Sequence, residues 1–248
     1  MKINSLKDKF LLFLFIFLML SACNQKKETM LYQVNKLNAP LEINGVWDKS
    51  PWSEMQALQL ANYMGEKPEH FPITKAKVAY DDEAVYVIFQ VEDRYVKAVH
   101  SNNQDPVYKD SCVEFFFIPS GKVKNGYFNL EMNCGGTMLF HHQLKPRTGS
   151  VELSDMHLSK IEVATSLPKI VDPEIESETT WVVEYRIPFS ILKGYHEFNS
   201  PVTGSLWRAN FYKCADDSSH PHWLTWAPVQ KPTPDFHMPE FFGYIEFH

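Results

Sequence analysis

The sequence predicts an all-β fold, built as an antiparallel β-sandwich. Most segments after residue 31 alternate apolar and polar residues, which is the period of a half-buried strand. Helical periodicity is scarce, and Gly, Asn, Asp and Pro separate the segments. The chain shows no repeat, low-complexity block or internal linker, so we expect one substantial core.

The chain is organised around residues 110–119, which read DSCVEFFFIP. This segment is rich in aromatic and β-branched residues and ends at a proline, which indicates a central strand. Because side chains alternate across a strand, one face carries Val113, Phe115 and Phe117, and the other carries Cys112, Glu114, Phe116 and Ile118. Burying an unpaired carboxylate is costly. Glu114 is therefore expected either to pair with a neighbouring strand or to belong to a ligand-binding face.

Ahead of this strand, the sequence predicts a short strand within 41–47 that meets a turn at Asn44-Gly45, and a hairpin formed by 75–80 and 84–91. Trp47 and Trp52 are interpreted as packing residues at one end of the sandwich. After the organising strand, the same alternation predicts strands at 126–134, 137–142, 160–164, 180–187, 205–213, 223–226 and 244–247. A single helical turn is expected at 188–192, and polar loops at 100–109, 145–149 and 216–222.

Three of these strands each combine an apolar face with a polar and aromatic face. If they share one sheet, its outer face gathers Glu114, Asn129, Glu131, Arg208, Asn210 and Tyr212. Solvated polar residues would explain such a face. However, amides, carboxylates and one Arg can also bond sugar hydroxyls, while aromatic rings cover the apolar face of a sugar ring.

The N-terminus has the pattern of an export signal. Three lysines precede a short apolar run, which then leads into Leu20-Ser-Ala-Cys23. This ending resembles a bacterial lipobox, so we predict that residues 1–22 are a signal peptide and that Cys23 carries lipids. Residues 23–34 would then be the lipidated cysteine and tether, and 35–248 the domain. The predicted location is the bacterial cell envelope, with a lipid anchor in the outer membrane.

Charge and cysteine content exclude several classes of function. Without residues 1–22 the chain keeps 21 basic and 29 acidic side chains, a net charge of −8, and has no basic patch, which argues against nucleic acid as a partner. Beyond Cys23 there are three cysteines, Cys112, Cys134 and Cys214, whose pairing the sequence leaves open. Three cysteines without Cys-x-x-Cys spacing fall short of a thiolate metal framework, so the sequence does not predict one.

A series of motifs resembles carbohydrate-binding module family 9, in the broad form found in exported bacterial proteins. They run in the family's order from about Lys36 to Phe247: Ile43-Asn-Gly-Val-Trp47 with Trp52, Ala79-Tyr-Asp-Asp-Glu-Ala-Val-Tyr-Val87, Val91-Glu-Asp93, Ser111-Cys-Val-Glu-Phe-Phe116, Phe128-Asn-Leu-Glu-Met-Asn133 and Pro239-Glu-Phe-Phe-Gly243. The resemblance implies a jelly-roll β-sandwich and non-catalytic binding of carbohydrate, such as the terminal sugar of a polysaccharide.

The resemblance also implies site residues. Two aromatic rings of the family sandwich the sugar, and these correspond here to Tyr108 and Phe236, with His237 adjacent. The hydroxyl-binding face corresponds to Glu114, Asn129, Glu131 and Asn210. This chain departs from sugar-binding members, which use Trp for both rings. Glu131 also stands where a basic residue is expected, for which Arg208 can compensate. No cofactor is expected, although family members can bind structural calcium, and the candidate oxygen donors are Asp81, Asp82, Glu92, Asp93, Asp216 and Asp217.

The predicted function is thus non-catalytic carbohydrate binding by a membrane-anchored lipoprotein. The main alternative is a structural or partner-binding sandwich that has lost sugar binding. A glycosidase using Glu114 and Glu131 as its two carboxylates is a further alternative. So are a haem-binding redox module with Met or His ligands and a zinc site at His141-His142 or His220-Pro-His222.

Overall fold

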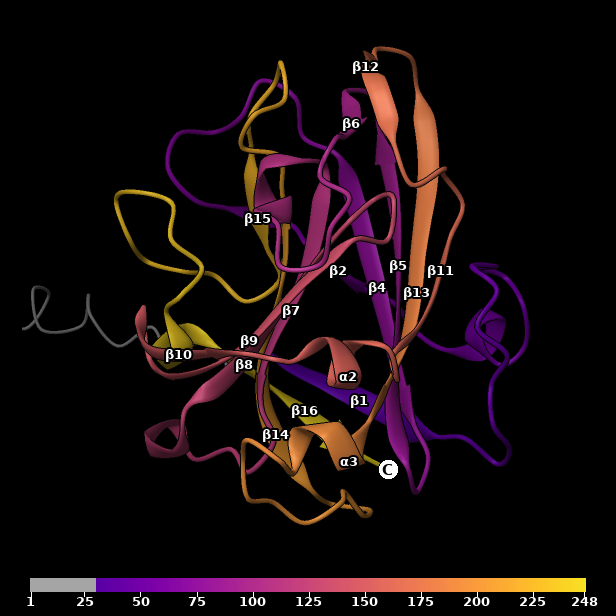
Figure 1. The fold of residues 1–248 in the computed structure, drawn as a ribbon, viewed down its shortest axis with the longest axis vertical. Coiled ribbons are helices and arrows are strands. Elements are labelled where there is room, and N and C mark those ends of the chain that lie inside the picture. The colour runs from indigo at the N-terminus through magenta and orange to yellow at the C-terminus, as the bar shows by residue number, and fades with distance from the viewer. Residues whose placement is uncertain (1–29) are drawn as a thin grey trace, which may run out of the picture.

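A computed structural model describes residues 30–248 (Figure 1). The predicted signal peptide, Cys23 and most of the predicted tether therefore lie outside the described residues. None of the described helices is long and apolar enough to span a membrane. Within this range the fold is all-β, as predicted, and it is a β-sandwich made by one long sheet that curls over on itself.

The strands form two halves of that sheet. The first half runs in the order β10 (Thr148–Glu152), β9 (Met138–Lys145), β8 (Tyr127–Asn133), β7 (Cys112–Ile118), β14 (Leu206–Cys214) and β16 (Gly243–Phe247). The second half runs β4 (Ile73–Tyr80), β5 (Ala84–Asp93), β13 (Thr179–Pro188) and β11 (Glu162–Thr165).

β1 (Leu31–Lys36) connects the two halves. Its first residues pair in parallel with β16, and its last two, Asn35 and Lys36, pair in parallel with β4. The predicted antiparallel β-sandwich is therefore confirmed, with parallel pairing at this one strand. The predicted boundary between tether and domain at residue 35 also lies inside β1. The sequence did not predict this strand because only two of its residues, Tyr32 and Val34, point into the core. Two inward residues make too short an alternation to recognise.

Smaller elements complete the domain. The remaining strands are β2 (Leu58–Gln59), β3 (Asn62–Tyr63), β6 (Val96–Ala98), β12 (Val171–Ile175) and β15 (Trp223–Thr225). The helices are α2 (Asp155–Leu158) and α3 (Phe189–Leu192), and the 3₁₀ turns are η1 (Trp52–Glu54), η2 (Val107–Lys109), η3 (Val123–Asn125) and η4 (Pro239–Phe241). The helical turn expected at 188–192 is thus confirmed as α3.

The main core lies between the two halves, with the predicted faces. Val113, Phe115 and Phe117 of β7 pack in one cluster with Val85, Val87, Phe89 and Val91 of β5. The core aromatic rings stack closely, since the Phe115 and Phe117 centroids are 4.4 Å apart and those of Phe115 and Phe211 are 4.9 Å apart. The hairpin of β4 and β5 was predicted correctly because its strands carry long, regular alternation.

Residues 41–47 do not form the predicted strand. Instead, the chain from Leu37 to Met55 covers the outer face of the second half, where Trp52 packs on Tyr86 and Ile88. Trp52 is fully buried there, which confirms the packing role assigned to it. Besides β1, five further strands were not predicted: β2, β3, β6, β10 and β12. β10 occupies part of the loop predicted at 145–149, and β12 lies in the polar stretch before β13.

Candidate functional site

The outer face of the first half carries a cleft with a volume of about 380 Å³. Strands β7, β8 and β9 form its floor, and η2, β15 and the loop at 234–237 form its walls. This volume is within the usual range for a small-molecule site. Five of the predicted ligand-binding residues and His237 line it: Tyr108, Glu114, Asn129, Glu131, Phe236 and His237.

Strand register brings the polar floor together. In one row across the sheet, Glu114 of β7 lies opposite Glu131 of β8 on one side and Tyr212 of β14 on the other. In the next row, Phe116 lies between Asn129 and Asn210. The three strands therefore share one sheet, as the proposed polar face required.

This face does not lie open to water, contrary to the prediction of an outer solvent face. Glu114, Asn129, Glu131, Asn210 and Tyr212 are all buried. The chain between β15 and β16 covers them, and its residues Val229, Phe236 and Phe242 form a second apolar cluster with Phe116 and Tyr212. The cleft gives access to Glu114, Asn129 and Glu131 on the floor.

Several buried polar atoms lining the cleft have no hydrogen-bond partner. They are Glu114 Oε2, Asn129 Oδ1, Glu131 Oε2, Gln143 Oε1 and His141 Nε2. The other oxygen of each glutamate is engaged, since Glu131 Oε1 accepts from Asn129 Nδ2 at 3.0 Å and Glu114 Oε1 accepts from the Cys214 thiol at 3.1 Å. Because buried polar groups are normally paired, these unpartnered acceptors indicate a ligand that brings donors.

Burial also changes the acidity of the two glutamates. It raises the pKa of Glu131 from 4.5 to about 7. It raises the pKa of Glu114 well above its ordinary value, and the neighbouring Cys214 and Glu131 add to that effect. Within the described residues, no basic nitrogen lies within 4.0 Å of either glutamate's carboxylate oxygens. Both can therefore hold a proton near neutral pH and either donate or accept a hydrogen bond.

Aromatic rings line the cleft, but not as an open pair. Tyr108 is 37% exposed and has ring surface available to a ligand. Phe236 is buried and stacks on Tyr212, with ring centroids 4.1 Å apart at an interplanar angle of 14°. One face of Phe236 is thus occupied by Tyr212. Trp223 is a third aromatic residue at the cleft, fixed by its indole N–H, which donates to Asp216 at 2.8 Å.

Charged residues at the rim hold the covering loop. Arg147 pairs with Asp235 at 2.9 Å, and Lys231 pairs with the same carboxylate. His237 lies beside them, with Nδ1 2.7 Å from the Tyr127 hydroxyl. Burial lowers the pKa of His237 from 6.5 to about 4, so this imidazole is neutral at physiological pH.

Two predicted site residues do not reach the cleft. Asn210 donates to the carbonyl of Ala227 and accepts from the backbone N–H groups of Phe211 and Ala227, which uses its amide on the covering chain. Arg208 donates to the carbonyls of Glu240 and Phe242 at 3.0 Å. Both side chains anchor the segment between β15 and β16 instead of facing a ligand, so we do not retain either as a hydroxyl-binding residue.

Sequence reasoning missed Gln143, His141, Arg147 and Trp223, which also line the cleft. His141 and Gln143 alternate on β9, so extending the alternation of the predicted strand at 137–142 by one residue would have placed both side chains on the Asn129 and Glu131 face. Arg147 and Trp223 come from a loop and a strand end, where no local pattern indicates which way a side chain points.

The candidate calcium ligands all have partners in the protein. Asp81 accepts from backbone N–H groups and Tyr86, and Asp216 accepts from Trp223, while Asp82, Glu92, Asp93 and Asp217 pair with Lys36, Lys75, His70 and Lys109. Among residues 30–248, ligand atoms from three metal-binding side chains come together at Cys112, Glu114 and Cys214. That group includes none of the calcium candidates and neither of the histidine pairs.

The sequence profile of carbohydrate-binding family 9 matches residues 48–247, which is most of the chain. The chain belongs to this family. Its members are carbohydrate-binding modules and are generally not catalytic, so the family assignment does not favour the glycosidase alternative.

Solved structures agree with the family 9 fold. A candidate carbohydrate-binding protein from Bacteroides uniformis ATCC 8492 superimposes with a TM-score of 0.79 at 27% identity, covering 89% of this chain and all of that one. A family 9 module from Caldicellulosiruptor kristjanssonii in complex with glucose gives 0.59 at 17% identity, covering 88% of this chain and 96% of that one. The cellotriose complex gives 0.60 at 17%, covering 88% and 93%. No curated protein sequence matches this chain.

Proposed function

We propose that this family 9 domain binds carbohydrate in the cleft over β7, β8 and β9, without catalysis. The observation that carries the proposal is the set of unpartnered acceptors on Glu114, Asn129, Glu131 and Gln143, all facing one cleft. Sugar hydroxyls can donate hydrogen bonds to these acceptors. The aromatic rings that line the cleft can cover the C–H faces of the sugar ring. The glucose and cellotriose complexes of the Caldicellulosiruptor module support this class of ligand.

In this proposal Tyr108 is the principal stacking ring and Phe236 supports the opposite wall. Tyr108 is 37% exposed at the mouth of the cleft, whereas Phe236 has one face packed on Tyr212. The ligand is accordingly held by one accessible ring and by a polar floor. A terminal sugar of a polysaccharide fits such a cleft, because the covering chain encloses the floor on one side.

The test is a binding measurement on residues 24–248. Glucose, cellotriose and an array of glycans would be presented with and without calcium, and affinities measured by calorimetry. We expect Tyr108→Ala to weaken binding by about tenfold, the value of a lost aromatic stacking contact. Tyr63→Ala is the matched control, because Tyr63 is 42% exposed and does not line the cleft.

Phe236 needs a conservative variant, because truncating it also uncovers Tyr212. Phe236→Leu keeps apolar volume and removes the flat ring, so binding should weaken while the melting temperature changes little. Failure of every glycan to bind a folded protein would contradict the proposal and favour the structural or partner-binding alternative. Hydrolysis of a glycan that Glu114→Gln abolishes would instead favour the glycosidase alternative.

We further propose that Cys23 anchors the domain by lipid to the outer membrane, in line with the lipobox-like Leu20-Ser-Ala-Cys23. Cys23→Ala should prevent incorporation of labelled fatty acid and shift the protein from the detergent phase to the aqueous phase. Cys134→Ala, which removes a buried cysteine of the domain, is the control and should leave the lipid in place. An unmodified Cys23 in the mature wild-type protein would refute the anchor.

A further inference from the structure

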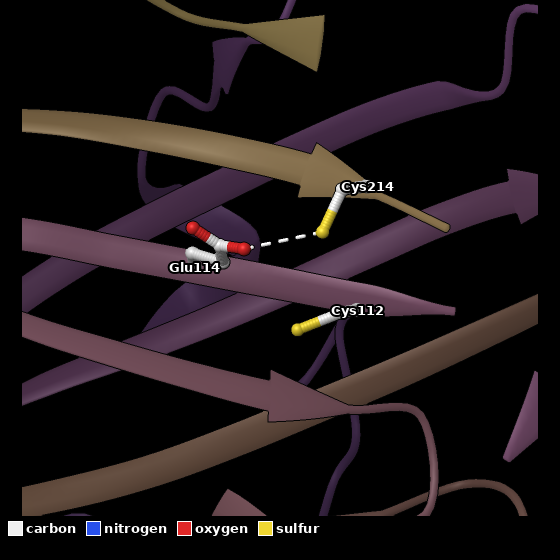
Figure 2. Close-up of side chains that lie close together, drawn as sticks. All are labelled: Cys112, Glu114 and Cys214. Carbon is white, nitrogen blue, oxygen red and sulfur yellow. Dashed lines mark hydrogen bonds between the residues drawn. The ribbon is translucent and has the colours of Figure 1, made fainter. Parts of the chain in front are cut away.

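Glu114 lies beside two cysteines, Cys112 and Cys214, which carbohydrate binding does not use, and Glu114 and Cys214 both line the cleft. Cys112 and Cys214 lie directly opposite each other on β7 and β14, and Glu114 follows Cys112 by two residues on the same face (Figure 2). The Sγ atoms and one carboxylate oxygen all lie within 4.8 Å of one another. All three residues are buried, and both cysteines are free thiols.

The hydrogen bonds of these three side chains leave one carboxylate oxygen of Glu114 without a partner. The Cys214 thiol is within hydrogen-bond distance of Glu114 Oε1 at 3.1 Å and of the Tyr108 carbonyl at 3.4 Å. Glu114 Oε2 has no partner, although only 2% of the residue is exposed. A buried carboxylate with a free oxygen beside two thiols is costly to maintain unless something else binds there.

We propose that Cys112, Glu114 and Cys214 form a binding site for a thiophilic divalent cation of the Zn²⁺ type. Two sulfurs and one carboxylate oxygen match the donors that zinc takes, whereas calcium requires oxygen ligands alone. Binding releases a proton to solvent from each thiol, and from the Glu114 carboxyl group where it is protonated, and the two thiolates and the carboxylate then surround the metal. Cys214 and Glu114 also line the cleft, so solvent can supply a fourth ligand.

A metal here would tie β14 to β7 at the end of the cleft. The Cys214 contact with the Tyr108 carbonyl links the same group to η2, which carries the proposed stacking ring. Metal binding and sugar binding both involve Glu114. They are measured separately, so either proposal can fail while the other holds.

The test uses reduced residues 24–248 without any sugar. Zn²⁺ alone would be added and the bound metal counted after dialysis, and Cd²⁺ would be titrated while thiolate-to-metal charge-transfer absorption is recorded. We expect one metal per chain, loss of two reactive thiols to a thiol reagent, and release of protons. Cys112→Ser and Cys214→Ser should abolish the absorption band, and Glu114→Gln should weaken affinity by about tenfold or more.

Cys134→Ser is the matched control, because Cys134 is also buried and free but its Sγ contacts the Lys97 carbonyl. It should retain the metal and the band. Circular dichroism would verify that each variant folds. The proposal is overturned by the absence of a band in wild type, by a band that survives in folded Cys112→Ser and Cys214→Ser, or by a Cys112–Cys214 disulfide in protein purified from the envelope.

Discussion

At the scale of single residues, two buried glutamates show how a structural carboxylate differs from a ligand-binding one. Glu184 of β13 is fully buried and accepts from the Trp52 indole at 2.8 Å, from Lys49 at 2.9 Å and from the N–H groups of Asn44 and Gly45. Glu114 of β7 is as deeply buried and keeps one oxygen free. Satisfied bonds make the first a fold anchor, whereas the free oxygen of the second supports its proposed role in ligand binding.

Glu131 gives a prediction on stability. Burial raises its pKa in the folded protein from 4.5 to about 7, so the folded state binds this proton more tightly than the unfolded state does. The contribution of this proton to the free energy of unfolding is therefore complete below about pH 4.5, and it is lost as the pH rises through about 7. We expect the unfolding free energy of wild type, relative to Glu131→Gln, to fall by about 3 kcal/mol between pH 4.5 and pH 8.

Urea unfolding at both pH values measures this difference. The control is Glu92→Gln, because the Glu92 side chain is 47% exposed and pairs with Lys75 on the surface. Because an exposed ion pair contributes little to stability, this variant should differ from wild type by less than about 1 kcal/mol at either pH. If the difference in unfolding free energy between wild type and Glu131→Gln does not change with pH, Glu131 does not bind a proton more tightly in the folded state.

At the scale of elements, the turn between β8 and η3 positions one wall of the cleft. Gly126 has φ +85°, and a Cβ at this residue would lie 2.4 Å from the carbonyl oxygen of Gln143 on β9. Only glycine lets the two strands approach there. The side chain of Gln143 reaches the cleft from that same strand, so the local packing of Gly126 affects the site.

Gly126→Ala should therefore destabilise the domain more than Gly204→Ala does. Gly204 has the same φ of +85° but no atom within 4 Å of an added Cβ, so it tests the backbone strain alone. We expect each variant to lose about 1 kcal/mol from the backbone, and Gly126→Ala to lose at least about 1 kcal/mol more from the clash. Thermal unfolding of both variants measures the contrast, and equal losses would show that β9 moves away without cost.

At the scale of the whole molecule, β1 closes the sandwich. It pairs with β16 of the first half and with β4 of the second, so it connects the edges of the two halves (Figure 1). Val34 is fully buried in the shared core and Tyr32 nearly so. Without β1 both neighbouring strands would expose unpaired backbone groups.

A chain that begins at residue 37 should consequently fail to fold cooperatively, whereas one that begins at residue 30 should fold like the longer chain. Circular dichroism and thermal unfolding of the two chains test this expectation. The comparison also tests the starting residue of the domain, because a chain from residue 37 with an unchanged melting temperature would make β1 dispensable.

Sequence by itself determined the all-β class, the family resemblance, the inward face of β7, the hairpin of β4 and β5, and six of the residues that line the cleft. The strand faces and the hairpin follow from alternation along a single strand, which is a local property, whereas Tyr108, Phe236 and His237 follow from the family resemblance. The signal peptide, the lipid on Cys23 and the outer-membrane location remain predictions from sequence.

Only the tertiary structure decided which polar residues line the cleft. Asn210 and Arg208 have the same alternation as Asn129 and Glu131, but the chain returning between β15 and β16 uses their donors and acceptors. Likewise, Cys112 and Cys214 are about a hundred residues apart and meet only through the register of β7 and β14. Strand register and loop return depend on contacts distant in sequence, so no local pattern contains them.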